Sequence, residues 1–395
     1  MVAAWSFATW WGDSRLLLSD DGLYATEGFA EGVHYPGRWS VFDALASPTG
    51  VRLLIVVAVL SCAALFVRPT KVIGVASLVA VFVCAASLNA RAPFAISSAE
   101  MYLVVLLFWA VLGSILGWST HSIRALRIQV VLVYLMPLLI RFLHGGDTWI
   151  DGSALRNVVD NADARRGPLG PLVRHLPDAV LSAATWGTLL IECTVVVLLL
   201  GMTVFSDRIP RSFRRGVISL AITLHVCIAV VCGLWFFSTV AIVGLLAATG
   251  LEFDDAADPR RGAVSWAMIA CVVVWSFLSI SSSPAVAAGE QKNLAALAVR
   301  GSGITQVWAV FSPNPPRMQR WVEIIDDNAT VIIDSRRASN RLRKLAQNVR
   351  SHPDGLLARS WLGALCRSGS VSLGLVSADP RVRTEALRAD CARQP

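Results

Sequence analysis

Three ionisable side chains interrupt otherwise apolar stretches of this sequence: Arg141, Glu192 and His225. A charged group at the centre of a bilayer costs about 3 kcal/mol on insertion scales, so such residues usually pair, reach toward the surface or serve a function. A carboxylate beside an imidazole fixes its tautomer and raises its basicity. Counted at about 1.5 Å per residue along their helices, Glu192 and His225 lie at a similar depth in the membrane. We therefore predict that they pair as catalytic residues that move protons or orient a redox head group. The alternative is a hydrogen-bonded strut between two helices.

The stretch IQVVLVYLMPLLIRFLHGGDTWIDG, residues 128–152, contains further candidates, because an apolar helix ends there in a polar cluster. This pattern predicts a site that opens at one face of a bilayer. The expected ligand-binding residues are Arg91, Arg141, Asp147, Trp149 and Asp151. Arg141 need not bind a ligand, because its long stem could carry its charge to the surface or down toward Glu192. Tryptophan is also common at membrane interfaces without a binding role.

The composition excludes an ordinary soluble protein. The 395 residues are 55% hydrophobic and only 16% charged, with a mean hydropathy of +0.60, whereas soluble domains are about 25% charged. Eight apolar stretches have the length of a membrane span: 51–67, 72–89, 101–118, 126–143, 179–205, 217–233, 234–249 and 264–280. The sequence predicts an all-α polytopic membrane helix bundle of about eight helices. Residues 217–249 are too long for one crossing, which predicts a tight turn near Gly233; one long tilted helix is the alternative.

Basic residues fall on alternate connections between these spans, at Arg68 and Lys71, Arg124 and Arg127, Arg208 to Arg215, and Arg260 and Arg261. Short loops rich in Lys and Arg stay in the cytoplasm. The sequence therefore predicts a multi-pass cell-membrane protein. Both termini, the 90–100 loop and the long 144–178 loop should be extracytoplasmic.

Outside the bundle the chain divides into polar segments. We expect an extracytoplasmic N-terminal segment at 1–50, a membrane bundle at 51–282, a linker at 283–299 and a small basic α/β tail at 300–395. In the tail, WVEII and TVIID are typical of strands, and 336–350 and 379–391 of helices. The tail could dock on the acidic segment 1–49, on anionic lipid or on a partner, or it could be a solvated surface.

The cysteines and short motifs narrow the function further. Cys366 and Cys391 are the only cysteines of the tail, and an oxidising exterior would permit them to pair, although the sequence leaves pairing and free thiols equally open. No metal-ligand spacing, phosphate-binding loop, nucleophile elbow or zinc-protease motif is present. We expect no metal site and no nucleic-acid partner. The expected partner is the lipid bilayer.

The order of several motifs is informative: R-x-P after the second span, VYLMPLLIRFL followed by W-x-D-G, LLIEC, a helix with LH, and QVWAVFSPNP. In this order the chain resembles the horizontally transferred transmembrane (HTTM) domain family, which includes the vitamin K-dependent gamma-carboxylases. The resemblance covers about residues 1–320. It implies a bacterial member with a lipid or quinone pocket that modifies or matures an exported peptide. Family members usually begin with one more helix before the segment that AWSFATWW matches.

One departure limits what the resemblance implies. Where the carboxylases carry the lysine that acts as base, this chain has Arg141, and an arginine stays charged and cannot act as that base. Carboxylation is therefore not expected. A different class of function, a non-catalytic membrane partner or maturation factor that binds an exported protein through its tail, is the alternative, and a small-solute transporter is a weaker third.

Overall fold

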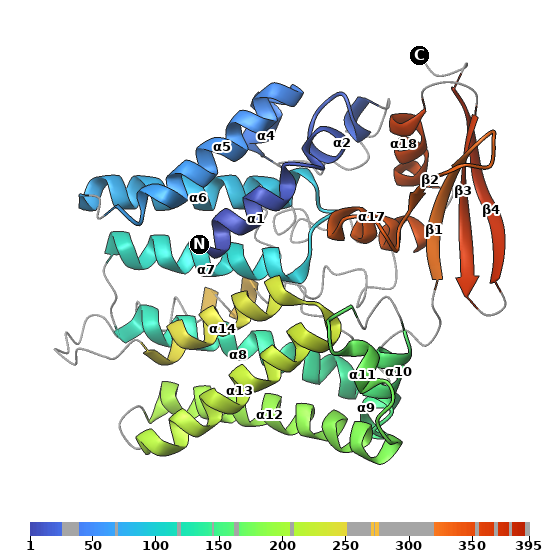
Figure 1. Ribbon diagram of the computed structural model, residues 1–395. Helices are drawn as coiled ribbons and strands as arrows, with labels where there is room; N and C mark the ends of the chain where they lie inside the picture. The colour runs from blue at the N-terminus through green and yellow to red at the C-terminus, as the bar shows by residue number, and fades with distance from the viewer. Residues whose placement is uncertain are drawn as a thin grey trace.

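The computed structural model describes residues 1–25, 39–67, 70–116, 120–143, 146–161, 166–205, 209–250, 270–271, 273–275, 320–351, 355–366, 370–378 and 381–391. The described chain is mostly helical, with one small antiparallel sheet near the C-terminus (Figure 1). The expected linker 283–299 and most of the expected span 264–280 lie outside the described residues.

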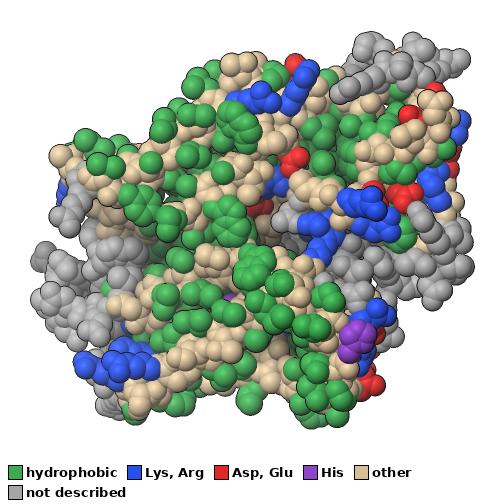
Figure 2. All heavy atoms as spheres, in the orientation of Figure 1, with side chains coloured by type: hydrophobic (Ala, Val, Ile, Leu, Met, Phe, Trp, Pro, Cys, Tyr) green, Lys and Arg blue, Asp and Glu red, His purple; other side chains and the backbone are tan. Residues whose placement is uncertain are grey.

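Among the described residues, five helices are long and apolar enough to cross a membrane. They are α6 (Lys71–Arg91), α7 (Ser98–Leu116), α8 (Thr120–Leu143), α12 (Asp178–Val204) and α13 (Arg211–Cys232). Two shorter apolar helices, α5 (Pro48–Ala64) and α14 (Trp235–Gly250), lie beside them. On the face shown in Figure 2, hydrophobic side chains spread over these helices, while most charged side chains gather near the tail and at helix ends. The fold is that of a helical membrane-embedded protein.

Helices α13 and α14 form a hairpin at the glycine where the sequence predicts a turn. Gly233 follows α13 with a φ of 71°, in the left-handed region that favours glycine. A Cβ there would lie 3.0 Å from the Cβ of Arg166. The segment beside it donates from Gly167 N to the Val231 carbonyl at 3.0 Å and from Leu169 N to the Val230 carbonyl at 2.9 Å. The tight turn is confirmed, and one long helix is excluded.

The two ends of the bundle differ. The tail and the short helices α9 (Asp147–Ile150), α10 (Ala154–Asp160) and α11 (Gly170–Val173) lie at one end (Figure 1). The N-terminal parts of α6, α8 and α13, which contain Lys71, Arg124, Arg127, Arg211 and Arg214, lie at the other. There Arg127 is buried and donates to the Ala248 and Met202 carbonyls, both at 2.9 Å. It therefore ties α8 to the last turns of α14 and α12.

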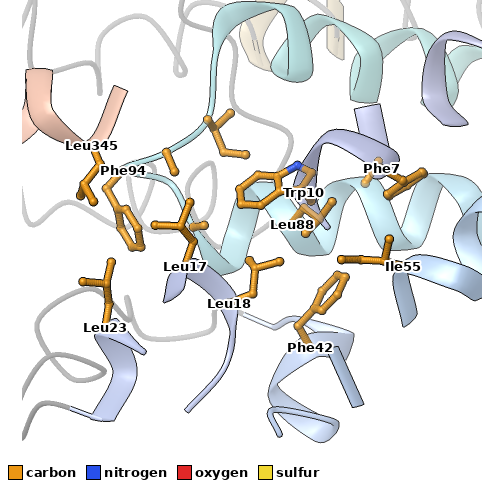
Figure 3. Packing of buried hydrophobic residues seen from close by; sticks show 14 of the residues in the cluster. Phe7, Trp10, Leu17, Leu18, Leu23, Phe42, Ile55, Leu88, Phe94 and Leu345 are labelled. Carbon is orange, nitrogen blue, oxygen red and sulfur yellow. The ribbon is translucent and has the colours of Figure 1, made fainter. Parts of the chain in front are cut away.

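The N-terminal segment folds onto α5 and α6 as α1 (Val2–Trp10), α2 (Ser14–Leu18), a 3-10 turn η1 (Leu23–Ala25) and α4 (Val41–Ala44). Its apolar side chains form one core with residues of α5, α6 and the tail. Figure 3 shows that core, in which Trp10, Leu18 and Leu88 pack together and Leu345 from the tail lies near Phe94. The N-terminal segment and the tail are thus parts of the same packed body.

The described part of the tail is a four-stranded antiparallel sheet, in the order β2-β1-β3-β4, with two helices. The strands are β1 (Arg320–Asp326), β2 (Val331–Asp334), β3 (Ser370–Ala378) and β4 (Arg381–Asp390), and the helices are α17 (Asn340–Ser351) and α18 (Leu356–Leu365). The first two strands and α17 match the sequence prediction. A disulfide joins Cys366, after α18, to Cys391, after β4.

One sequence prediction for the tail is wrong. Residues 379–391 were expected to be helical, yet 381–390 form β4, which pairs with β3 through Leu373 opposite Leu387 and Val371 opposite Ala389. Leu387 and Ala389 pack against the buried core. Because the pairing and the burial outweigh the helix preference of EALRA, tertiary context decides the conformation.

The tail docks on the bundle through Arg341 of α17. This guanidinium is buried, forms an ion pair with Glu100 of α7, donates to Thr9 Oγ1 at 2.8 Å and lies 3.5 Å from the centre of the Trp10 ring. Ser339 donates to Asp13 at 2.6 Å beside it. Burial lowers the pKa of Arg341, and the Glu100 carboxylate opposes that shift. We call Arg341, Glu100 and Trp10 the tail latch.

Candidate functional site

A cavity of about 100 Å³ lies among α8, α12, α13 and α14, at the end of the bundle that carries α9 to α11. Its walls are mostly apolar side chains, and α9 and α10 contribute Trp149, Leu155 and Val158. Pro137 on α8 also lines it. A proline has no N–H to donate to the carbonyl of Val133, four residues earlier, so the helix is weakened where it faces the cavity. Four residues predicted from the sequence line this one space: Arg141, Trp149, Glu192 and His225.

Arg141 and Glu192 form an ion pair across the cavity wall, between the last turn of α8 and the middle of α12. Their side chains are 4% and 12% exposed, and the Arg141 guanidinium lies 3.8 Å from the centre of the Trp149 ring. Arg141 therefore reaches inward to Glu192 instead of extending to the membrane surface.

Two glycines place Trp149 over that pair. Gly146 donates to the Arg141 carbonyl at 2.7 Å, and a Cβ on Gly146 would collide with the same carbonyl, so only glycine permits this tight return of the chain. Gly152 has a φ of 84° and starts the turn into α10. Asp151 accepts from Ser153 N at 2.8 Å within the same turn. The W-x-D-G sequence is thus a turn that folds its tryptophan back onto Arg141.

Tyr134 and His225 form the second polar pair of the cavity. The Tyr134 hydroxyl lies 2.8 Å from His225 Nε2, and the His225 ring is flanked by Phe237, whose centroid is 5.9 Å away. His225 is 4% exposed, and its Nδ1 has no hydrogen-bond partner among the described residues. The sequence did not single out Tyr134, because an uncharged tyrosine in an apolar helix carries no signal of unusual cost.

The expected pairing of Glu192 with His225 is not what the structure forms. Glu192 pairs with Arg141, and His225 pairs with Tyr134. Glu192 and His225 were expected to pair because they lie at a similar depth, but depth does not determine which sides of two helices face each other. The long stem of Arg141 makes the difference, because it brings a full positive charge to the carboxylate.

Three of the predicted rim residues are not in the cavity lining. Arg91 is buried elsewhere, where its guanidinium is bound by Asp20, Asp43 and the Leu18 carbonyl and lies 4.0 Å from the Tyr24 ring centre. Asp147 is exposed in the first turn of α9, and Asp151 is exposed in the turn before α10. Arg91 thus fastens the N-terminal segment to α6, and the two aspartates belong to the turns that carry Trp149.

The arrangement is suited to holding a small polar group inside an apolar space. The Arg141–Glu192 pair carries no net charge, and the Tyr134–His225 pair can donate or accept hydrogen bonds and move a proton. Among the described residues, no group of three or more His, Cys, Asp or Glu side chains could hold a metal ion. No protein-family model, no curated protein and no solved structure matches the chain.

Proposed function

We propose that this protein binds the polar head of a neutral lipid-soluble molecule, such as a quinone, in the cavity between α8, α12, α13 and α14. The observation that carries the proposal is the coincidence of two polar pairs, Arg141–Glu192 and Tyr134–His225, on the wall of one apolar cavity. Small-molecule sites are typically apolar with a few polar groups that orient the ligand.

Charge and size narrow the class of ligand. Because Glu192 neutralises Arg141 at the cavity wall, the pair favours a neutral head group over a phosphate or a carboxylate. A cavity of about 150 Å³ in another protein takes up a benzene molecule, and this one is about 100 Å³. The smaller volume limits the head group to one ring at most, so a two-ring quinone would need the helices to move apart.

The resemblance to the HTTM family supports an enzyme of the bacterial branch that modifies or matures an exported peptide. A bound quinone would supply two-electron redox chemistry. In this chain Arg141 would hold Glu192 in place, Trp149 would shield the pair from water, and Glu192 and His225 would hold or move protons at the head group. The charged Arg141 does not replace the neutral lysine base of the carboxylases, so we do not propose carboxylation.

We also propose that the protein spans the bacterial cell membrane about eight times, with the tail and the cavity end outside. The clustering of Lys71, Arg124, Arg211 and their neighbours at the opposite end supports this orientation. An outside position would give the cavity access to exported peptides, and it agrees with the Cys366–Cys391 disulfide, which needs an oxidising compartment.

The test is mass spectrometry of the quinones and lipids that copurify with the protein in mild detergent. We expect a quinone or another neutral lipid in stoichiometric amount with the wild type and much less with Glu192→Gln. Thr194→Val is the matched control, because Thr194 lies on the same helix, bonds only to the Leu190 carbonyl among the described residues, and does not line the cavity. Bulk phospholipid alone in all three samples would contradict the proposal and favour the non-catalytic partner of an exported protein.

A further inference from the structure

One buried polar atom of the Tyr134–His225 pair lacks a hydrogen-bond partner among the described residues. Both side chains are buried, at 5% and 4% exposure. The hydroxyl and Nε2 satisfy each other at 2.8 Å. Nδ1 is left without a partner among the described residues, although the ring lines the cavity. Buried polar atoms are almost always hydrogen-bonded, so an orphan at a cavity wall calls for a physical cause.

The position of the imidazole proton follows from counting unsatisfied groups. Glu192 is paired with Arg141, and His225 contacts the uncharged Tyr134 instead. Because burying an unpaired charge is costly, the neutral form of the imidazole is favoured in this apolar setting. If Nε2 carried the proton, the buried Tyr134 O–H would lose its acceptor, and Nδ1 would lack a donor as well. If Tyr134 donates to Nε2, the proton lies on Nδ1 and only one group stays unsatisfied.

This tautomer specifies the chemistry of the missing partner. A neutral Nδ1–H is a donor, so its partner must be a hydrogen-bond acceptor. The lining also contains Glu192, Thr185 and Thr188, but no described acceptor lies within hydrogen-bond distance of Nδ1. The lining residues Leu224, Ile228 and Phe237 offer no side-chain acceptor. A neutral oxygen on a bound molecule, such as a carbonyl, fits both the donor and the uncharged surroundings.

We infer that Tyr134 is a positioning residue that fixes the tautomer of His225, so that Nδ1–H binds a carbonyl oxygen of the molecule held in the cavity. This inference rests on the proposed function and deepens it. It names the atom that recognises the head group and the class of atom that it recognises.

The first arm of the test measures the tautomer without any ligand. Histidine labelled with ¹⁵N is incorporated into the full-length protein in detergent micelles, and the ring signals of His225 are identified by their loss in His225→Gln. We expect a protonated Nδ1 and an unprotonated Nε2 in the wild type, and a gain of Nε2–H in Tyr134→Phe. A wild-type ring with its proton on Nε2 would overturn the inference. Tyr24→Phe, which removes a buried hydroxyl that donates to the Arg91 carbonyl outside the cavity lining, should leave the signals unchanged.

The second arm measures binding to delipidated protein of two probes, a short-chain prenylated benzoquinone and the matching prenylated benzene without carbonyls. We expect Tyr134→Phe to weaken benzoquinone binding about tenfold, the range of one hydrogen bond, and to leave the hydrocarbon probe unaffected. Equal weakening of both probes, or of neither, would overturn the inference. If the wild type binds neither probe, the proposed function fails and the carbonyl partner falls with it, whereas the tautomer is still decided by the first arm.

Discussion

Two of the clusters in which an arginine, a glutamate and a tryptophan meet, at the cavity and at the tail latch, have different surroundings. At the cavity, Arg141 forms an ion pair with Glu192, and its guanidinium lies 3.8 Å from the centre of the Trp149 ring. At the tail latch, Arg341 forms an ion pair with Glu100, and its guanidinium lies 3.5 Å from the centre of the Trp10 ring. The latch lies between the tail and the bundle, where Arg341 also binds Thr9 and the Ser6 carbonyl. The cavity pair instead borders an open space beside Tyr134 and His225.

A buried charge is therefore not by itself a sign of a binding site. Desolvation is costly in both places, and pairing with stacking offsets it in both. Only the surroundings separate them, because the latch joins two parts of the fold whereas the cavity pair leaves room for another molecule. The same substitutions should then change stability in similar ways but ligand content in only one place.

The largest expected effect on stability is that of Arg341→Met, which breaks the tail latch and leaves Glu100 buried and unpaired. We expect a loss of about 3 to 5 kcal/mol in the free energy of unfolding. The second substitution in Arg341→Met/Glu100→Leu should restore most of it. Thermal unfolding followed by tryptophan fluorescence, with proteolysis of the tail, measures both. A single variant as stable as the wild type would show that the latch does not hold the tail.

The next largest effect on stability is expected from removal of the disulfide, which cross-links the tail and does not line the cavity. Cys366 and Cys391 are 25 residues apart, and a cross-link that closes a loop of this size contributes about 3 kcal/mol by restricting the unfolded chain. We expect Cys366→Ser/Cys391→Ser to lower the unfolding temperature of the tail while the copurified lipid stays at the wild-type level. Loss of that lipid would contradict the separation of the two regions.

A third comparison replaces the cavity pair with apolar residues. Arg141→Met/Glu192→Leu removes both charges, so the free energy of unfolding should stay within about 1 kcal/mol of the wild type or rise. The neutral lipid that copurifies should nevertheless disappear, whereas it should persist in Arg341→Met/Glu100→Leu. Equal lipid content in the two double variants would show that the cavity pair and the latch do not differ in function.

The smallest effect concerns pH and is confined to the tail. Burial favours a higher pKa for Asp334, but the hydrogen bonds and charge of Arg336 outweigh it, so the pKa lies below the ordinary value of 3.8. A depressed carboxyl pKa stabilises the fold above that ordinary value, and the stabilisation is lost as the pH falls through the folded-state value. Asp334→Asn should thus be less stable than the wild type at pH 6, with a gap that narrows below pH 4. Unfolding curves that stay equally far apart down to pH 3 would contradict this.

The sequence predicted the polar residues of the cavity better than their partners. Arg141, Glu192 and His225 were identifiable because charge in an apolar helix is costly, and Trp149 because W-x-D-G interrupts the apolar pattern. Which of them pair depends on helix rotation, which the pattern of one chain does not encode. Tyr134 and the strand at 381–390 were missed for the same reason, since their roles come from partners far away in the sequence.

Whether the cavity holds a ligand is best decided by a cryo-electron microscopy map of the wild-type protein in nanodiscs made with its native lipids. We expect density for a non-protein group in the cavity, within hydrogen-bond distance of His225 Nδ1 and beside the Arg141–Glu192 pair. We expect no such density at the tail latch. A cavity filled only by water, or closed by side chains, would contradict the proposed binding site.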